Sequence, residues 1–195
     1  MGRFVQYVMS PGTQRFALVR SFDDTYSPAR DPYRKMRLAV QAGRRTGKDE
    51  AAMNGAVRNC HEKFRSHYLD IARGWLSFIE PRANTALVSS GTARWHTTDL
   101  TVRVTPDLVL MHPDGTIDAL KLHLYNDPIT AQAAEITLWL MNQTLDQTHP
   151  GARPMVLDVR RRREYTRVRP TPGYANWLES EAASLMFLYR RQRAA

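Results

Sequence analysis

The amino-acid sequence predicts an α/β fold in which a helix, a group of strands, a second helix and a last strand follow one another. Three observations predict it. An apolar stripe at helical spacing runs over 49–79, two apolar runs flank an Asp-Gly turn between 107 and 124, and a second helical pattern covers 129–145. Strand patterns that alternate with helical patterns are typical of α/β proteins. The 43% of hydrophobic residues is enough for a core in a chain of 195 residues.

The first 48 residues are expected to form a hairpin and a basic linker. Apolar-rich runs at Arg3–Met9 and Gln14–Ser21 flank a Ser-Pro-Gly-Thr sequence, which favours a β-hairpin. Tyr33–Ala42 is predicted as a short helix, and the glycine- and arginine-rich run at 43–48 is expected to end it as a solvated basic turn. That run lacks both the spacing and the following hydroxyl residue of a phosphate-binding loop.

A long helix is expected from Asp49, which stands where an N-cap residue would, to about Ile79. Its apolar residues recur at the spacing of a buried helical stripe. The stripe consists of Val57, Phe64, Tyr68, Ile71, Trp75 and Phe78. Thr85–Ser90 and Ala93–Val104 are predicted strands. The second alternates polar and apolar residues, so one of its faces is expected to meet water.

The clearest strand signal is the turn Pro113-Asp114-Gly115 between two apolar runs, which is typical of a hairpin. Strands are predicted at 107–111 and 116–124, and the hairpin can bring Asp107 and Lys121 together. Because side chains alternate along a strand, the second strand has a leucine-rich face and a mixed face. The leucine-rich face, expected to be the core side, carries Asp118, Leu120, Leu122 and Leu124. The mixed face, expected to meet a groove, solvent or a covering helix, carries Ala119, Lys121, His123 and Tyr125.

The last third of the chain predicts a helix, a short hairpin and a final helix. The helix covers 129–145, the two short strands lie at 155–159 and 164–168, and an amphipathic helix covers 174–193. The elements together predict one core with an addition at each end. The predicted units are 1–48, a hairpin and basic linker packed on the core, 49–169, the α/β core, and 170–195, the C-terminal amphipathic helix.

The charge of the chain favours an anionic partner. Its net charge is +9 and its pI is about 10.1, values typical of proteins that bind nucleic acid. Arginine accounts for 24 of the 28 basic residues. A GC-rich coding sequence is therefore an alternative explanation of the excess charge.

Cys60 is the single cysteine, which excludes an intramolecular disulfide, a cysteine-based zinc site and an iron–sulfur cluster within one chain. The sequence shows no signal-peptide pattern and no apolar run long enough to span a membrane. We therefore expect a cytoplasmic protein without a membrane partner.

Pro106-Asp107 and Lys121 form a partial motif, because the aspartate opens one strand of the predicted hairpin and the lysine lies on the next. Over about 49–163 the sequence resembles the PD-(D/E)XK nuclease superfamily. The family signature is Pro-Asp at the start of one strand and, on the next, an acid two residues before a lysine. The resemblance implies a core of helix, three strands, helix and strand around a mixed sheet. It also implies hydrolysis of phosphodiester bonds with Mg²⁺ or Mn²⁺, in which Asp107 binds the metal and Lys121 orients the attacking water.

The sequence departs from this signature at Ala119, which stands where the family has its second acid. Asp118 is adjacent but projects from the opposite face of the strand. The resemblance offers two replacements, Glu135 on the helix after the lysine strand and Glu62 on the helix before the sheet. Magnesium prefers hard oxygen ligands, carboxylates among them. An active site would therefore use Asp107, Glu135 and Glu62 as metal ligands, and Asp107, Lys121 and Glu135 as catalytic residues.

Two further features are candidate contacts to nucleic acid, with DNA expected rather than RNA. The run Arg160, Arg161, Arg162 and Arg163 can hold phosphates or be a solvated strand end, and His123 shares the face of Lys121. Three functions follow as hypotheses. The chain is a metal-dependent nuclease, a nuclease-like subunit that has lost hydrolysis but binds nucleic acid or partner proteins, or a protein–protein module, homo-oligomers included, with no nucleic-acid role.

Overall fold

The computed structural model describes residues 1–23, 31–167 and 171–194. Five strands form one mixed sheet, in the order β1 (Ala86–Val88), β4 (Leu108–Met111), β5 (Ile117–His123), β6 (Arg153–Asp158) and β7 (Arg163–Tyr165). Neighbouring strands are antiparallel except β5 and β6, which are parallel. A separate antiparallel hairpin, β2 (Ala93–His96) and β3 (Thr101–Val104), is inserted in the chain between β1 and β4.

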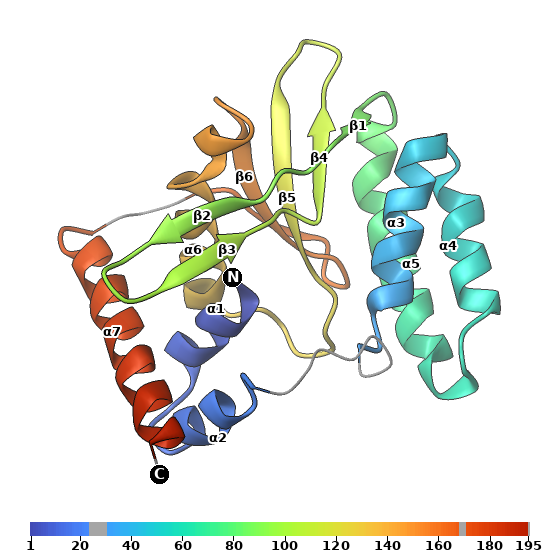
Figure 1. Cartoon of the computed structure of the whole chain (residues 1–195). Helices are drawn as coiled ribbons and strands as arrows, with labels where there is room; N and C mark the ends of the chain where they lie inside the picture. Colours follow the sequence, from blue (N-terminus) through green and yellow to red (C-terminus); the bar gives the residue numbers. More distant parts are fainter. Residues whose placement is uncertain (24–30, 168–170, 195) are drawn as a thin grey trace.

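Helices cover both faces of the sheet (Figure 1). One side carries α3 (Arg34–Thr46), α4 (Asp49–Arg58) and α5 (Arg65–Ile79), and the other carries α1 (Gly2–Met9), α2 (Gln14–Arg20), α6 (Ala131–Asn142) and α7 (Tyr174–Arg193). The described residues also include short 3₁₀ turns at η2 (Glu62–Phe64), η3 (Glu80–Arg82) and η4 (Leu145–Gln147). The predicted α/β class is therefore confirmed. No helix in the described parts of the chain combines the length and the hydropathy that a membrane span needs.

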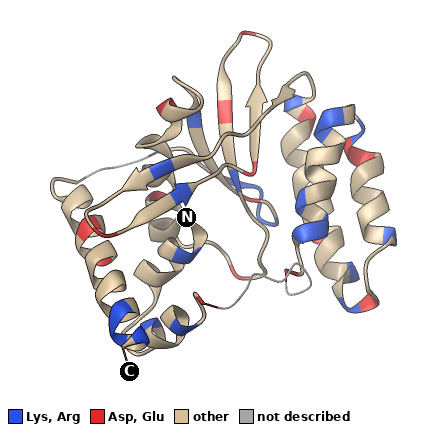
Figure 2. Ribbon diagram, viewed as in Figure 1, with Lys and Arg blue, Asp and Glu red and all other residues tan. Residues whose placement is uncertain are grey.

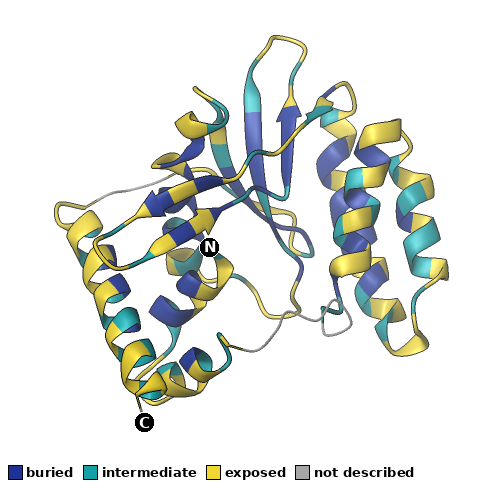
Figure 3. Cartoon of the chain, in the orientation of Figure 1, coloured by how far each residue is buried: buried dark blue, intermediate teal, exposed yellow. Residues whose placement is uncertain are grey.

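The alternation of side chains along β5 divides the core between the two faces of the sheet. Leu120, Leu122 and Leu124 pack with Ile71 and Trp75 of α5, as the leucine-rich face predicts. The mixed face is also covered, because Ala119 packs in a second core with residues of α1, α6 and α7. Figure 3 shows buried residues on the central strands and on the helix sides that meet them. The site residues on β5 therefore lie in a strand enclosed from both sides.

Helix α5 lies directly against the end of β6 because position 74 is glycine. A Cβ atom there would collide with the backbone carbonyl oxygen of Val159. The close approach brings Trp75, which is fully buried, onto the sheet. Glycine is therefore required at this crossing of helix and strand.

The predicted N-terminal hairpin is wrong, because both runs are helices, α1 and α2. Phe4, Val5, Tyr7 and Val8 of α1 are all buried, and their spacing suits one face of a helix. α1 packs on α6, and α2 packs on α7. The sequence of each run is locally compatible with a strand or a helix, so contacts with distant helices decide its conformation.

The run at 43–48 is not the solvated turn that was expected. α3 continues to Thr46 and ends at Gly47, whose φ of 67° is in the left-handed region. The Arg44 side chain is 4% exposed, and its guanidinium bonds Asp49 at 2.9 Å and the carbonyl oxygens of Ala83 and Thr85. A buried arginine needs such partners. The Asp49 side chain therefore pairs with Arg44, and it does not cap α4 as predicted.

Two predicted elements are each divided in the structure. The helix expected over 49–79 is broken between α4 and η2, where the Nδ1 atom of His61 accepts the N–H of Lys63. The strand expected over 93–104 is the hairpin β2–β3. Its turn is closed because Thr97 N–H donates to the Leu100 carbonyl oxygen at 2.9 Å, and the Thr97 hydroxyl accepts the Leu100 N–H at 3.1 Å. Threonine hydroxyls favour such turns, and this signal outweighs the alternating pattern.

The remaining elements agree with their predictions. The hairpin β4–β5, the helix α6, the strand β6 and the helix α7 lie where the sequence places them. The expected partner of β6 at 164–168 corresponds to β7, and its last residue lies outside the described residues. The predicted boundary between 169 and 170 also lies outside them.

Candidate functional site

Asp107 and Lys121 are brought together as the hairpin predicts. Asp107 immediately precedes β4 and is held on β5 because its N–H donates to the Leu120 carbonyl oxygen at 2.8 Å. Lys121 lies in the middle of β5, and its Nζ donates to Asp107 Oδ1 at 2.9 Å. The two side chains are 14% and 29% exposed, so the pair is screened from water only in part.

The carboxylate of Asp107 is engaged at both oxygens. Oδ2 accepts the backbone N–H of Leu122 at 2.8 Å, while Oδ1 accepts from Lys121. Lys121 also reaches the carbonyl oxygen of Thr105, at 3.4 Å. The α-amino group of Met1 lies nearby, and burial, followed by the charges of Lys121 and Arg103, lowers its pKa to about 6. The charge of Asp107 is thus balanced within the protein by Lys121, and the lowered pKa favours the neutral form of the Met1 amino group.

A small cavity opens beside Asp107. It has a volume of about 360 Å³, and its polar lining includes Gln41, Arg45, Ser89 and Ser90. Gln41 comes from α3 and donates from Nε2 to the Asp107 carbonyl oxygen at 3.1 Å. The cavity offers hydroxyl and guanidinium donors, which suit a phosphate better than a metal cation.

The predicted metal ligands do not meet. Ala119 is fully buried, so the place of the family's second acid is filled by the core. Glu62 lies on η2 with its side chain 74% exposed, where it pairs with Arg65 at 3.0 Å. Glu135 lies on α6 near Tyr174, whose pKa is raised to about 12 by burial and then by the Glu135 charge.

Both oxygens of the Asp107 carboxylate are already bonded within the protein, which limits its use as a magnesium ligand. Among residues 1–23, 31–167 and 171–194, no three His, Cys, Asp or Glu side chains come close enough to hold a metal. Magnesium in proteins is usually held by one or two carboxylates together with waters and substrate phosphates. A metal at Asp107 would have to displace the Lys121 ammonium and compete with the Leu122 N–H.

Of the four arginines from 160 to 163, the first two bond other groups of the protein. The Arg160 side chain is 6% exposed and bonds the Leu124 carbonyl oxygen at 2.9 Å and Asp70 at 3.4 Å. Arg161 pairs with the buried Asp158 at 3.4 Å. Arg162 and Arg163 are exposed, at the turn between β6 and β7. Half of the predicted nucleic-acid contact is therefore occupied by bonds within the protein.

His123 lies at the end of β5 and is half-buried. Its Nε2 lies 2.7 Å from the carbonyl oxygen of Asp127, and its ring packs on Tyr125 at 5.5 Å between centroids. These contacts link the strand to the segment before α6. On the mixed face, His123 therefore makes its contacts with nearby residues of the chain and is separate from the Asp107–Lys121 pair.

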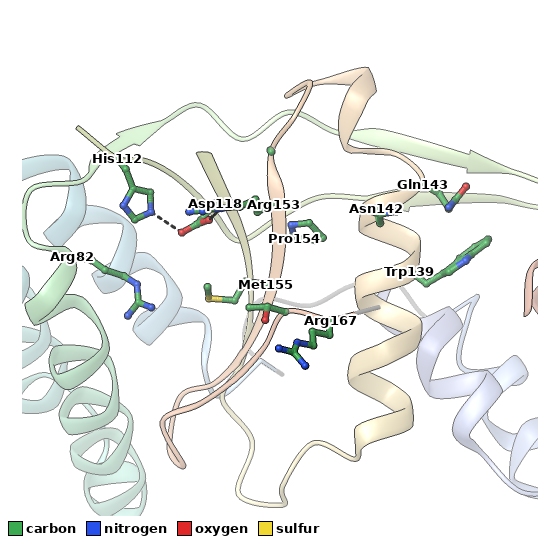
Figure 4. Close-up of a pocket in the computed structure, with 12 residues that line it drawn as sticks. Arg82, His112, Asp118, Trp139, Asn142, Gln143, Arg153, Pro154, Met155 and Arg167 are labelled. Carbon is green, nitrogen blue, oxygen red and sulfur yellow. Dashed lines mark hydrogen bonds and ion pairs between the residues drawn. The ribbon is translucent and has the colours of Figure 1, made fainter. Parts of the chain in front are cut away.

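A larger cavity, which the sequence did not indicate, lies at the other end of β5 and β6 (Figure 4). It has a volume of about 900 Å³ and includes Arg82, Trp139 and Arg167 in its lining. At its wall the buried carboxylate of Asp118 lies 2.6 Å from His112 and 2.8 Å from Arg153. An acid on the leucine-rich face of the strand was the one signal that could have pointed to this network, because a core carboxylate needs partners.

Comparisons with known proteins add no family to this geometry. No protein-family model matches the chain, and no curated protein is significantly similar to it in sequence.

Proposed function

We propose that this chain is a nuclease-like protein that binds nucleic acid and has lost metal-dependent hydrolysis. One observation carries the proposal. The carboxylate of Asp107 is bonded at both oxygens, by Lys121 and by the Leu122 N–H, while the position of a second acid is the buried Ala119. The residues of the motif are thus joined to each other and do not form an open carboxylate pair.

The order of elements supports the nuclease-like part of the proposal. The chain runs through α5, β1, β4, β5, α6 and β6, with β2–β3 as an insertion, and β5 and β6 are parallel. This order resembles the helix, three strands, helix and strand of the PD-(D/E)XK core. In the proposed likeness, Asp107 and Lys121 would correspond to that family's first acid and its lysine. The likeness concerns arrangement, whereas function must be argued from the site.

The chemistry of the site supports the loss of hydrolysis. Metal-dependent cleavage needs an ion that polarises the phosphate and lowers the pKa of the attacking water. No group of three metal-ligating side chains is found in the described residues, and the charge of Asp107 is balanced by Lys121 at 2.9 Å. The pair instead fastens the start of β4 to the middle of β5.

The charge of the surface supports a nucleic-acid partner. The chain carries nine net positive charges, and basic residues occur on both strands of the hairpin and on helices at both ends of the molecule (Figure 2). The basic residues of the hairpin strands are exposed. Binding to the phosphate backbone releases counterions, so affinity should fall steeply as salt rises and depend little on base sequence. An apolar protein interface would show neither behaviour.

Hydrolysis is the second candidate, favoured by the short Asp107–Lys121 distance alone. One experiment separates the two. DNA binding is measured by fluorescence anisotropy with labelled duplex and single-stranded DNA, with and without Mg²⁺ or Mn²⁺. Cleavage of the same DNA is followed on gels. Metal binding is measured by calorimetry for wild type and Asp107→Ala. We expect salt-dependent binding without a metal requirement and no cleavage. Metal-dependent cleavage that Asp107→Ala abolishes would establish the nuclease instead, and wild type that binds no nucleic acid would refute the proposal.

A further inference from the structure

The hairpin β2–β3 presents an outward face made of polar and basic side chains. Along β2 and β3 exposed and buried residues alternate, and the register sets Arg94 opposite Arg103 and His96 opposite Thr101. His96 Nδ1 lies 3.1 Å from the Thr101 hydroxyl. The exposed residues of the two strands include no acid. The acid of the turn, Asp99, is paired with Arg190 of α7 at 2.6 Å.

The opposition of Arg94 and Arg103 is unfavourable in the free protein. Like charges directly opposite each other on neighbouring strands destabilise a sheet. Among the residues that the structure describes, neither guanidinium has a hydrogen-bond or ion-pair partner, and the two residues face each other in the register of the hairpin. An anion placed between two such groups would remove the repulsion and accept bonds from both.

The hairpin holds these side chains on a fixed support. On its inner face Trp95 is 8% exposed and packs on Phe4 and Trp139, with ring centroids 5.6 and 5.7 Å apart. The side-chain amide of Gln147 bonds both the N–H and the carbonyl oxygen of Arg94, each at 2.8 Å. The outer edge of β2 is thus paired as another strand would pair it. A ligand would meet groups that are already in place, which lowers the entropy cost of binding.

We infer that the outward face of β2–β3 binds the phosphodiester backbone of nucleic acid, with Arg94 and Arg103 as its phosphate contacts. The inference rests on the proposed function and names its binding surface. The strands carry no exposed Phe, Tyr or Trp, since Trp95 points inward. The face therefore offers contacts to phosphates and lacks a large aromatic platform for bases, so we expect its binding to depend little on sequence.

The position of the face links it to the candidate site. Arg103 lies four residues before Asp107, and the intervening Thr105 offers its carbonyl oxygen to Lys121. A backbone bound along the hairpin would lead toward the Asp107–Lys121 pair. This surface replaces the one predicted at 160–163, where Arg160 and Arg161 are already bonded within the protein.

The test compares two double variants that remove the same charge. Arg94→Ala/Arg103→Ala changes the hairpin face, and Arg34→Ala/Arg58→Ala changes two exposed arginines on α3 and α4 whose guanidinium groups have no bonding partner in the described chain. Binding of a fluorescein-labelled duplex of mixed sequence is measured by anisotropy over a range of salt concentrations. We expect the slope of log K against log salt to become shallower by about 1.8 for the hairpin variant, because two phosphate contacts are lost. The control variant should keep the wild-type slope.

The outcomes separate this inference from the proposed function. Equal loss in both variants, or an unchanged slope in the hairpin variant, would overturn the inference while the proposed function stands. Absence of binding by wild type would overturn both. Displacement of the duplex by polyglutamate as readily as by unlabelled duplex would assign the face to an acidic protein partner and refute the inference. A thermal melt adds an independent check, since Arg94→Ala alone should raise the melting temperature by relieving the repulsion, and a fall would contradict it.

Discussion

Asp107 and Lys121, 14 residues apart in the sequence, form an ion pair of 2.9 Å that joins the start of β4 to β5. The second oxygen of Asp107 accepts the N–H of Leu122, so one carboxylate serves two donors of the same strand. The arrangement resembles a motif that elsewhere binds a metal, yet here the aspartate is bonded to the lysine and to the neighbouring backbone. The first two predictions test whether its role is structural.

Asp107→Ala should destabilise the protein more than Lys121→Ala. Removing the aspartate leaves both the Lys121 ammonium and the Leu122 N–H without their acceptor, whereas removing the lysine leaves one carboxylate that still accepts a backbone bond. We expect a loss of about 2 to 3 kcal/mol for the first variant and about 1 kcal/mol for the second, measured by urea unfolding. Asp107→Asn, which can still accept the Leu122 N–H, should lie closer to wild type, and the reverse order of the two alanine variants would contradict a structural role.

Ala119→Glu should not restore a metal site. The side chain of Ala119 is fully buried among residues of α1 and α6, so a carboxylate there would be taken out of water. We expect a destabilisation of about 3 kcal/mol or more and no magnesium binding by calorimetry. Ala183→Glu, at an exposed position on α7, serves as the control that adds the same charge. A stable Ala119→Glu variant that binds Mg²⁺ would mean that the core opens toward Asp107.

Arg160 and Arg162 should differ sharply although they are two residues apart. The Arg160 side chain is only 6% exposed and bonds the Leu124 carbonyl oxygen and the Tyr33 hydroxyl, whereas Arg162 is exposed. Arg160→Ala is expected to lose about 1 to 3 kcal/mol of stability, and Arg162→Ala less than about 0.5 kcal/mol, by chemical denaturation. Similar losses in the two variants would show that the run acts as one unit.

Two glycines on neighbouring helices should respond in opposite ways to alanine. At Gly74 of α5 a Cβ meets the carbonyl group of Val159, and at Gly55 of α4 it meets open space. Gly74→Ala should cost about 1 to 3 kcal/mol through overpacking. Gly55→Ala should stabilise by about 0.5 to 1 kcal/mol because alanine loses less backbone entropy in a helix. Thermal melts of both variants check this. An unchanged melting temperature for Gly74→Ala would mean that α5 lies farther from β6.

Gln147→Ala should loosen the hairpin that carries Arg94 and Arg103. The Gln147 amide supplies both outer bonds of the Arg94 backbone, so its loss leaves that edge to water. Hydrogen exchange at the Arg94 N–H should quicken by about tenfold, as for a lost hydrogen bond of about 1.4 kcal/mol. Gln143→Ala, which changes an exposed amide just after α6, should leave exchange there unchanged. Unchanged protection in Gln147→Ala would mean that Trp95 alone anchors the hairpin.

Local patterns predicted several elements because the forces that form them act within a few residues. The turn at Pro113-Asp114-Gly115 pairs β4 with β5 as expected, and the amphipathic pattern of α7 covers the predicted range. The same reasoning failed for α1, since its apolar residues suit a strand or a helix and the choice depends on packing against α6 and α7. It also failed at Thr97, where a side-chain turn folds one expected strand into two.

The sequence by itself determined the α/β class, the β4–β5 hairpin and the meeting of Asp107 with Lys121. Only the tertiary structure decided which charged side chains are bonded within the protein. It engages Arg44 and Arg160 in bonds within the protein, pairs Glu62 with Arg65 at the surface, and leaves Arg94 opposite Arg103 on an exposed face. The physical reason is the distance along the chain between the groups that interact. A turn or a stripe is set by neighbours in the chain, whereas the partner of a charge is set by segments that only the packed fold brings together.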